Sequence, residues 1–189
     1  MARATYEDVL NAPEDKVAEI LDGELVLSPR PAARHTTAHG RVFRRIAGPF
    51  EDGVDGPGGW WILIEPELHF GEHVVVPDIA GWRRERMPSV PDVAFFTLPP
   101  DWVCEVLSPS TERIDRGKKL RIYAEAGVPQ AWLLNPIERT LEELRLRDGA
   151  WTIVSVFAGS EVVRAEPFAD VELRLDDLWG ESPAIPDAR

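Results

Sequence analysis

Two acidic residues lie in segments whose other residues are mostly apolar. Asp78 follows the run Val74-Val75-Val76-Pro77, and Glu105 lies within the apolar stretch 102–107. A charged carboxylate inside a buried strand is costly unless it is paired with a cation or binds a metal. These two acids therefore predict one shared site at the ends of two strands. The alternative interpretation is that each acid forms a salt bridge with an arginine.

A basic residue that could join these acids lies on the next helix, predicted over residues 113–125. Asp115, Lys119 and Tyr123 follow one another at intervals of four residues and so share one helix face. The connection before this helix is short, so Lys119 can approach the carboxylates. Two carboxylates that bind Mg²⁺ or Mn²⁺, with a lysine that offsets charge in the transition state, can hydrolyse a phosphodiester bond. The alternative is a solvated basic helix face.

The elements that must position these residues are predicted to form a single domain, residues 1–189. Its ends are an N-terminal helical segment, residues 1–18, and a loose tail, residues 181–189. Asp22-Gly23 and Asp148-Gly149 are each a two-residue hairpin signal between apolar runs. Elsewhere the pattern predicts helices over 33–50 (stopped by Gly48-Pro49) and 113–125, and strands over 60–70, 73–82, 102–107 and 130–134. This order is typical of a mixed α/β (α+β) fold.

Composition restricts the class of protein. The chain has 189 residues, of which 44% are hydrophobic and 29% charged, which is typical of a globular domain. The one cysteine, Cys104, excludes an intrachain disulfide and favours a reducing compartment, so we expect a cytoplasmic protein. No run approaches the roughly 18 apolar residues of a membrane span, and the first residues carry no apolar signal core.

The distribution of charge along the sequence decides whether nucleic acid can be a binding partner. A net charge of −12 argues against nucleic acid, because phosphate contacts need cations. However, segments 30–45, 83–86 and 113–121 together carry 13 basic and only two acidic residues. If the three segments lie on one face, they form a basic cleft on an acidic body, and this local field can steer DNA. If they lie on different faces, the objection to DNA returns.

The longest informative stretch runs from Pro100 to Pro129. It reads Pro100-Asp101-Trp102-Val103-Cys104-Glu105-Val106-Leu107-Ser108-Pro109-Ser110-Thr111, then Asp115, Lys119, Tyr123 and Ala126-Gly127-Val128-Pro129. This stretch resembles the Uma-two family of restriction endonucleases, a branch of the PD-(D/E)XK nuclease superfamily. The resemblance begins at Glu19 with Asp22-Gly23-Glu24, passes through Pro77-Asp78 and reaches Leu173-Arg174-Leu175.

The resemblance implies a restriction-endonuclease-like fold, a central mixed β-sheet flanked by helices, here with an N-terminal hairpin and a C-terminal β-hairpin. It also implies Mg²⁺-dependent DNA cleavage, with Asp78 and Glu105 as catalytic residues and metal ligands. In the superfamily a lysine lies two residues after the second acid. Leu107 stands there in this chain, so Lys119 is the match and Lys118 the fallback. Glu24 matches a recurrent family acid, which completes the metal site or only structures the hairpin.

Further side chains are candidates for contacts with DNA or phosphate, namely His35, Arg41, Ser108, Lys118 and Tyr123. His35 and His39 have the i, i+4 spacing that can bind zinc, but the sequence shows no third ligand. A homodimer is expected by analogy with other enzymes that cut duplex DNA. Two alternatives stay open: a nuclease-like module that binds or regulates without cutting, and a metal-dependent hydrolase of another phosphoester.

Overall fold

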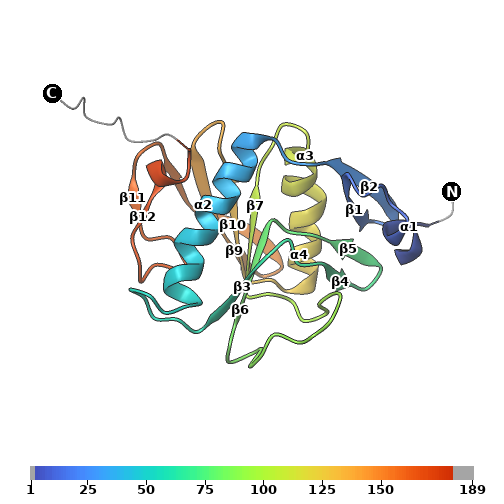
Figure 1. Cartoon of the computed structure of the whole chain (residues 1–189), viewed down its shortest axis with the longest axis horizontal. Helices are drawn as coiled ribbons and strands as arrows, with labels where there is room; N and C mark the ends of the chain where they lie inside the picture. Colours follow the sequence, from blue (N-terminus) through green and yellow to red (C-terminus); the bar gives the residue numbers. More distant parts are fainter. Residues whose placement is uncertain (1–2, 181–189) are drawn as a thin grey trace.

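The computed structural model describes residues 3–180 as a mixed arrangement of strands and helices (Figure 1). The elements in chain order are α1 (Tyr6–Leu10), β1 (Lys16–Leu21), β2 (Glu24–Pro29), α2 (Ala33–Phe50), β3 (Trp60–Ile64), β4 (Leu68–Phe70), β5 (His73–Val75), β6 (Ile79–Arg83), β7 (Trp102–Val106), α3 (Glu112–Ile114), the π-helical turn η1 (Asp115–Lys119), α4 (Leu120–Ala126), β8 (Gln130–Asn135), β9 (Thr140–Arg147), β10 (Ala150–Ala158), β11 (Val162–Val163), β12 (Leu173–Arg174) and the 3₁₀ turn η2 (Leu175–Asp177).

The largest sheet has six strands in the order β10-β9-β8-β7-β6-β3. Strands β7 and β8 pair in parallel, and their neighbours pair antiparallel, so the predicted mixed sheet is confirmed. The parallel pair requires a crossover, which α3, η1 and α4 provide. A second sheet, in the order β2-β1-β5-β4, carries the predicted N-terminal hairpin.

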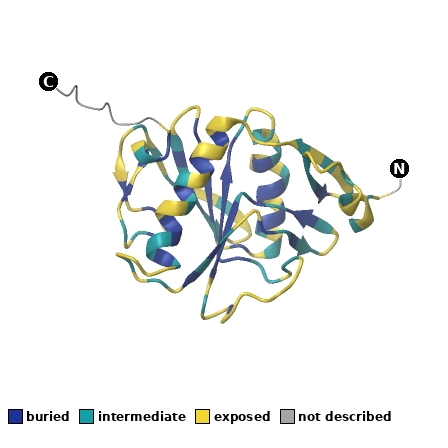
Figure 2. Ribbon diagram, viewed as in Figure 1, coloured by how far each residue is buried: buried dark blue, intermediate teal, exposed yellow. Residues whose placement is uncertain are grey.

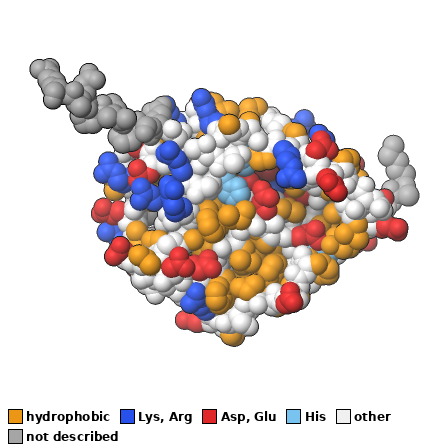
Figure 3. Space-filling view, in the orientation of Figure 1, with side chains coloured by type: hydrophobic (Ala, Val, Ile, Leu, Met, Phe, Trp, Pro, Cys, Tyr) orange, Lys and Arg blue, Asp and Glu red, His pale blue; other side chains and the backbone are white. Residues whose placement is uncertain are grey.

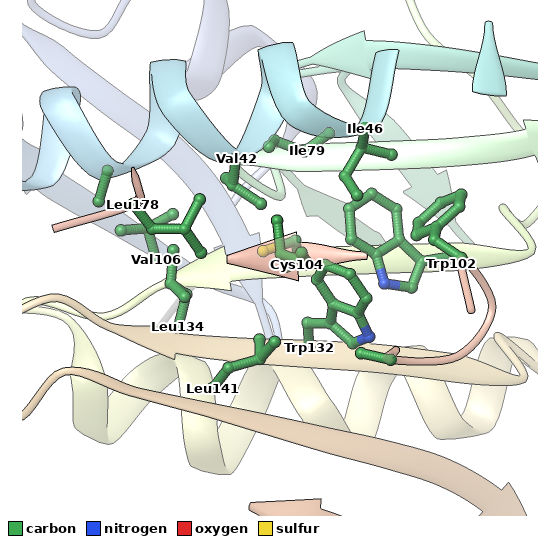
Figure 4. Packing of buried hydrophobic residues seen from close by; sticks show 14 of the residues in the cluster. Val42, Ile46, Ile79, Trp102, Cys104, Val106, Trp132, Leu134, Leu141 and Leu178 are labelled. Atoms are coloured by element: carbon green, nitrogen blue, oxygen red, sulfur yellow. The ribbon is translucent and has the colours of Figure 1, made fainter. Parts of the chain in front are cut away.

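Strand β7 separates two apolar cores because its side chains alternate between the two faces of the sheet. Trp102, Cys104 and Val106 pack on the side of α2 (Figure 4), together with apolar residues from the region of β11 and β12. Val103 packs on the opposite side with residues of α4 and the smaller sheet. Burial follows the same division, since the central strands and the inward helix faces are buried (Figure 2). Glu105 alternates with Cys104 and therefore faces the side of α4.

The two hairpin predictions are confirmed. Asp22 and Gly23 have φ of 58° and 77°, and Asp148 and Gly149 have φ of 50° and 76°. Positive φ at both central residues produces the tight turn whose twist matches the paired strands. These turns fix the antiparallel registers of β1 with β2 and of β9 with β10, the latter being the C-terminal β-hairpin.

Some of the predicted elements differ from the structure. In the described part of the N-terminal helical segment, residues 3–18, only α1 is helical, and Lys16 already belongs to β1, where pairing with β2 overrides the short helical pattern. The range predicted for the helix over 33–50 is confirmed, but Gly48-Pro49 does not stop α2, which continues to Phe50, whose buried ring packs in the core. The strand predicted over 73–82 is divided into β5 and β6, which belong to different sheets.

Other expectations concern the ends of the chain and the membrane. The tail predicted over 181–189 lies outside the described residues. Among the residues that the structure does describe, no helix has the length and apolar character needed to cross a membrane.

Candidate active site

A pocket of ≈ 340 Å³ lies where the two sheets meet the start of the crossover helix. Its walls come from β1, from the β2–α2 connection with the start of α2, from Glu65 after β3, from the break between β5 and β6, and from β7 with the segment that follows it. Among the charged side chains that line it are Glu19, Asp78, Glu105, Asp115 and Lys119. The pocket therefore unites residues from five separate parts of the sequence.

Glu105 lies within β7 and is only 1% exposed. Its two carboxylate oxygens lie 2.9 and 3.0 Å from Nζ of Lys119, and the hydroxyl of Tyr123 donates a hydrogen bond of 2.6 Å to Oε1. The predicted meeting of Glu105 with Lys119 is thus observed as a direct ion pair. Burial raises the pKa of Glu105 well above its usual range.

Lys119 is shared among several acceptors. Besides Glu105, its Nζ lies 3.4 Å from Glu19 and 3.7 Å from Asp115, and it donates a 2.9 Å hydrogen bond to the carbonyl of Val76. Burial alone would lower the pKa of this amine, but the surrounding carboxylates raise it well above its usual range. We call Glu19, Glu105, Asp115 and Lys119 the lysine cluster. Three acids share one ammonium, so the cluster accommodates additional positive charge.

The helix that carries Asp115 and Lys119 is irregular at this point. The turn Asp115–Lys119 is π-helical, and the backbone N–H of Leu120 bonds to the carbonyl of Asp115, five residues earlier. Both charged residues are buried, and each is 4% exposed. Such π-helical turns occur frequently at functional sites because they re-aim side chains within a helix. The sequence predicted a continuous α-helix here and did not anticipate this turn.

Asp78 lies in the break between β5 and β6, directly before β6 begins. Its Oδ2 accepts a 2.7 Å hydrogen bond from the backbone N–H of Val106, and its Oδ1 lies 3.3 Å from Nε2 of His35. Burial would raise the pKa of Asp78, but the hydrogen bond and charge of His35 lower it. Burial would lower the pKa of His35, but the hydrogen bond and charge of Asp78 raise it above its usual value.

Ser108, a predicted contact for DNA or phosphate, also lines the pocket, and its hydroxyl lies 2.9 Å from that of Thr111 at the start of the crossover helix. Of the residues predicted for the site, the structure therefore brings together five: His35, Asp78, Glu105, Ser108 and Lys119.

The other four residues predicted for the site, Glu24, Arg41, Lys118 and Tyr123, do not line the pocket. Glu24 is exposed and pairs with Lys118 at 2.8 Å, so neither side chain reaches the pocket. Arg41 donates a hydrogen bond to the carbonyl of Asp177 on the side of η2. Tyr123 is completely buried, and its hydroxyl is bonded to Glu105 rather than directed to the surface where DNA would bind.

The predicted basic cleft is only partly formed. Arg83 lies at the far end of β6 from Asp78, so segment 83–86 is not beside the pocket. Several cations of the three segments are already paired with carboxylates, namely Arg45, Arg86, Arg116, Lys118, Lys119 and Arg121. Figure 3 shows basic side chains at the margins of a central hollow rather than as a continuous surface. The net charge of −12 therefore still argues, in part, against binding to DNA.

Glu19 is the member of the lysine cluster whose role the sequence analysis missed. It lies in β1, is 3% exposed, and its Oε1 accepts a 2.8 Å hydrogen bond from the backbone N–H of Val76. The signal that identified Glu105, an acid within an apolar run, is also present around Glu19 in Val17-Ala18-Glu19-Ile20-Leu21. The short helical patterns that the sequence also shows over residues 5–21 concealed that signal.

Comparisons with known proteins agree with this architecture. A sequence model of the Uma2 family, described as "Putative restriction endonuclease", matches residues 3–176. A solved structure described as a "putative nuclease belonging to DUF820", from Anabaena variabilis, has 25% sequence identity and a TM-score of 0.74. That alignment covers 93% of this chain and 97% of the other. A search of curated proteins found no match.

Proposed function

Because the chain belongs to the Uma2 family of nuclease-like proteins, we propose that it is a metal-dependent endonuclease that hydrolyses phosphodiester bonds in DNA. The observation that carries this proposal is the convergence of Asp78, Glu105 and Lys119 on one pocket. In this proposal Asp78 and Glu105 are the metal ligands, and Lys119 is the catalytic cation.

The donor set fits a divalent cation such as Mg²⁺ or Mn²⁺. Asp78 and Glu105 supply carboxylate oxygens, which are the ligands that these ions prefer. A carboxylate has about four lone-pair positions, so Glu105 can contact a metal while it still accepts from Lys119 and Tyr123. A bound ion polarises the phosphate and lowers the pKa of a water molecule, which supplies the nucleophile.

The other parts of the proposed mechanism, charge stabilisation and orientation of the metal ligands, depend on groups that the fold holds rigidly. Lys119 lies within the pocket as a permanently charged donor, so it can offset the negative charge that develops on the phosphate oxygens. Tyr123 orients Glu105, and the backbone N–H of Val106 orients Asp78. Because these contacts exist before substrate binds, they cost no reorganisation during the reaction.

DNA is the substrate that we favour, although the acidic body predicts weak binding. Five arginines from the basic segments are exposed and have no ionic partner in the described part of the chain; of these, Arg30 donates a hydrogen bond to the Glu14 carbonyl and Arg83 lies over the Trp60 ring, which leaves Arg34, Arg44 and Arg113. Arg34 and Arg113 directly precede the pocket-lining residues His35 and Ile114, so they can contact phosphates near the pocket. A small number of such contacts makes non-specific binding weak and strongly dependent on salt.

We further propose a cytoplasmic homodimer. The single cysteine, Cys104, is buried, and burial raises the pKa of its thiol, so it has the character of a core residue in a reducing compartment. A dimer would place two pockets on opposite strands of a duplex. Light scattering during size-exclusion chromatography, with and without a short duplex, measures the oligomeric state directly.

The experiment that tests the nuclease proposal is plasmid cleavage with Mg²⁺ and Mn²⁺. We expect supercoiled plasmid to be nicked by the wild-type chain, and we expect Glu105→Gln and Asp78→Asn to lose the activity. Matched controls are Glu143→Gln and Asp101→Asn, which change buried acids outside the pocket. Retained cleavage in Glu105→Gln or Asp78→Asn would contradict the role given to that residue.

The alternative of an inert binding module has one observation in its favour, namely that Lys119 already has acidic partners on several sides. It predicts that the wild-type chain neither nicks plasmid nor binds Mn²⁺ through Asp78 and Glu105. Calorimetric titration of Mn²⁺ into wild type and Glu105→Gln distinguishes the two functions.

A further inference from the structure

We propose that His35, His39 and Asp78 form a binding site for one divalent transition-metal ion, distinct from the metal site proposed between Asp78 and Glu105. We call these three residues the histidine cluster. The proposal goes beyond the nuclease function, because the nuclease mechanism uses neither histidine, although Asp78 belongs to both sites.

The first observation is that two buried ring nitrogens have no partner. His35 and His39 are 8% and 7% exposed, and they lie one turn apart on the same face of α2. Within the described residues, neither Nδ1 of His35 nor Nε2 of His39 has a hydrogen-bond partner. Leaving a buried polar atom unsatisfied costs about 1–3 kcal/mol, so two on neighbouring side chains require a physical reason.

The second observation is that a third ligand lies beside them. One ring nitrogen from each histidine and one carboxylate oxygen of Asp78 all lie within 4.8 Å of one another. The sequence indicated the histidine pair but no third ligand. In the structure that ligand is Asp78, which lies in the break between β5 and β6. Metal–ligand bonds of about 2.0–2.2 Å place ligand atoms about 3–3.5 Å apart, so shifts of about 1 Å would close the site.

The chemistry of these donors selects the class of ion. Two imidazoles and one carboxylate suit borderline ions such as Zn²⁺, whereas Mg²⁺ prefers oxygen ligands alone. Imidazole nitrogen binds a metal when it is neutral and otherwise unbonded, and each of the two histidines has one buried ring nitrogen without a partner among the described residues. Three protein ligands leave a coordination position for water or another small ligand.

The ion also has a route to the cluster. His35 and Asp78 line the ≈ 340 Å³ pocket, while His39 lies behind them on the next turn of α2. In Figure 3, histidine and acidic side chains adjoin each other near the central hollow. An ion can therefore enter from solvent without unfolding the helix.

Zinc titration tests the proposal. The 189-residue chain is stripped with a chelator, and Zn²⁺ is titrated into it by calorimetry. We expect about one ion per chain, and a loss of affinity of 100-fold or more in His39→Leu, since removal even of groups that only support a metal ligand costs 10–100-fold. His69→Leu is the matched control, because His69 stacks on Phe95 outside the cluster and should not alter the affinity.

Two further measurements keep the proposal falsifiable. If His39→Leu does not fold, His39→Gln retains a polar side chain, and Co²⁺ replaces Zn²⁺ so that its visible absorption reports nitrogen ligation directly. Equal Zn²⁺ affinity in wild type and a folded His39 variant, or identical Co²⁺ spectra, would overturn the site. Glu105→Gln should keep the Zn²⁺ affinity. A chain that binds Zn²⁺ through His39 and does not cut DNA would therefore disprove the nuclease proposal and leave this one standing.

Discussion

The lysine cluster and the histidine cluster adjoin in one pocket but satisfy their polar atoms differently. In the lysine cluster, the ammonium of Lys119 and both oxygens of Glu105 have partners within hydrogen-bond distance. In the histidine cluster, two ring nitrogens have none in the described chain. The first is a closed network that folds without a further component, whereas the second is complete only when something else binds.

The difference shows what burial of charge achieves in each place. A buried charge is tolerated when partners compensate for it, and removal of one partner is then strongly destabilising. Buried nitrogens without partners lower stability until a ligand occupies them. The lysine cluster should therefore dominate folding stability, and the histidine cluster should dominate the response to added ions.

The largest effect is expected for Lys119→Met. This change leaves Glu19, Glu105 and Asp115 buried without a cation, and we expect the free energy of unfolding at neutral pH to fall by about 3–5 kcal/mol. Urea denaturation followed by circular dichroism measures the loss. Lys118→Met is the matched control, because its partner Glu24 is largely exposed. Equal losses in the two variants would show that the lysine cluster is not a closed network.

A smaller loss is expected for Tyr123→Phe, which removes only the hydrogen bond to Glu105 and keeps the ring in the core. A hydrogen bond to a charged group contributes about 1.5–3 kcal/mol, so the unfolding free energy should fall within that range. The affinity for a DNA duplex, measured by fluorescence anisotropy, should stay unchanged because Tyr123 is buried. A lower DNA affinity at unchanged stability would instead support the predicted contact between Tyr123 and DNA, against which its burial argues.

The histidine cluster should respond to pH when no metal is present. Asp78 raises the pKa of His35 above its usual value of about 6.5, so the folded protein binds the proton more tightly than the unfolded chain. The resulting stability is fully present below about pH 6.5 and is lost as the pH rises through the folded pKa. Urea denaturation in EDTA should therefore show a larger difference between wild type and His35→Gln at pH 5.5 than at pH 8. A difference that grows with pH would have the wrong sign.

The smallest effect is expected for Glu24→Gln. Its ion pair with Lys118 is exposed, and such pairs contribute about 0–1 kcal/mol. Neither the unfolding free energy nor the Mn²⁺ affinity should change measurably. A weaker Mn²⁺ affinity would instead support Glu24 as a metal ligand, the role that the family resemblance implies.

Much of this arrangement follows from local signals in the sequence. Paired positive φ at Asp22-Gly23 and the apolar run around Glu105 depend on neighbouring residues alone, so the hairpin and the buried acid were predictable. The division of the segment 73–82 between two sheets depends on pairing with β1 and β7, which lie far away in sequence. The position of Asp78 beside His35 and His39 follows from that division, and no local pattern indicates it.

The π-helical turn at Asp115–Lys119 makes the pocket depend on the number of residues as well as on their types. Deleting one residue there, such as the exposed Gly117, would let the backbone relax to an ordinary α-helix with its hydrogen bonds intact. The part of the helix before the deletion would then be rotated by about 100° relative to the part after it. Asp115 and Lys119 would no longer face the same carboxylates. A deletion of a single codon could thus dismantle the lysine cluster while every one of its side chains was still encoded.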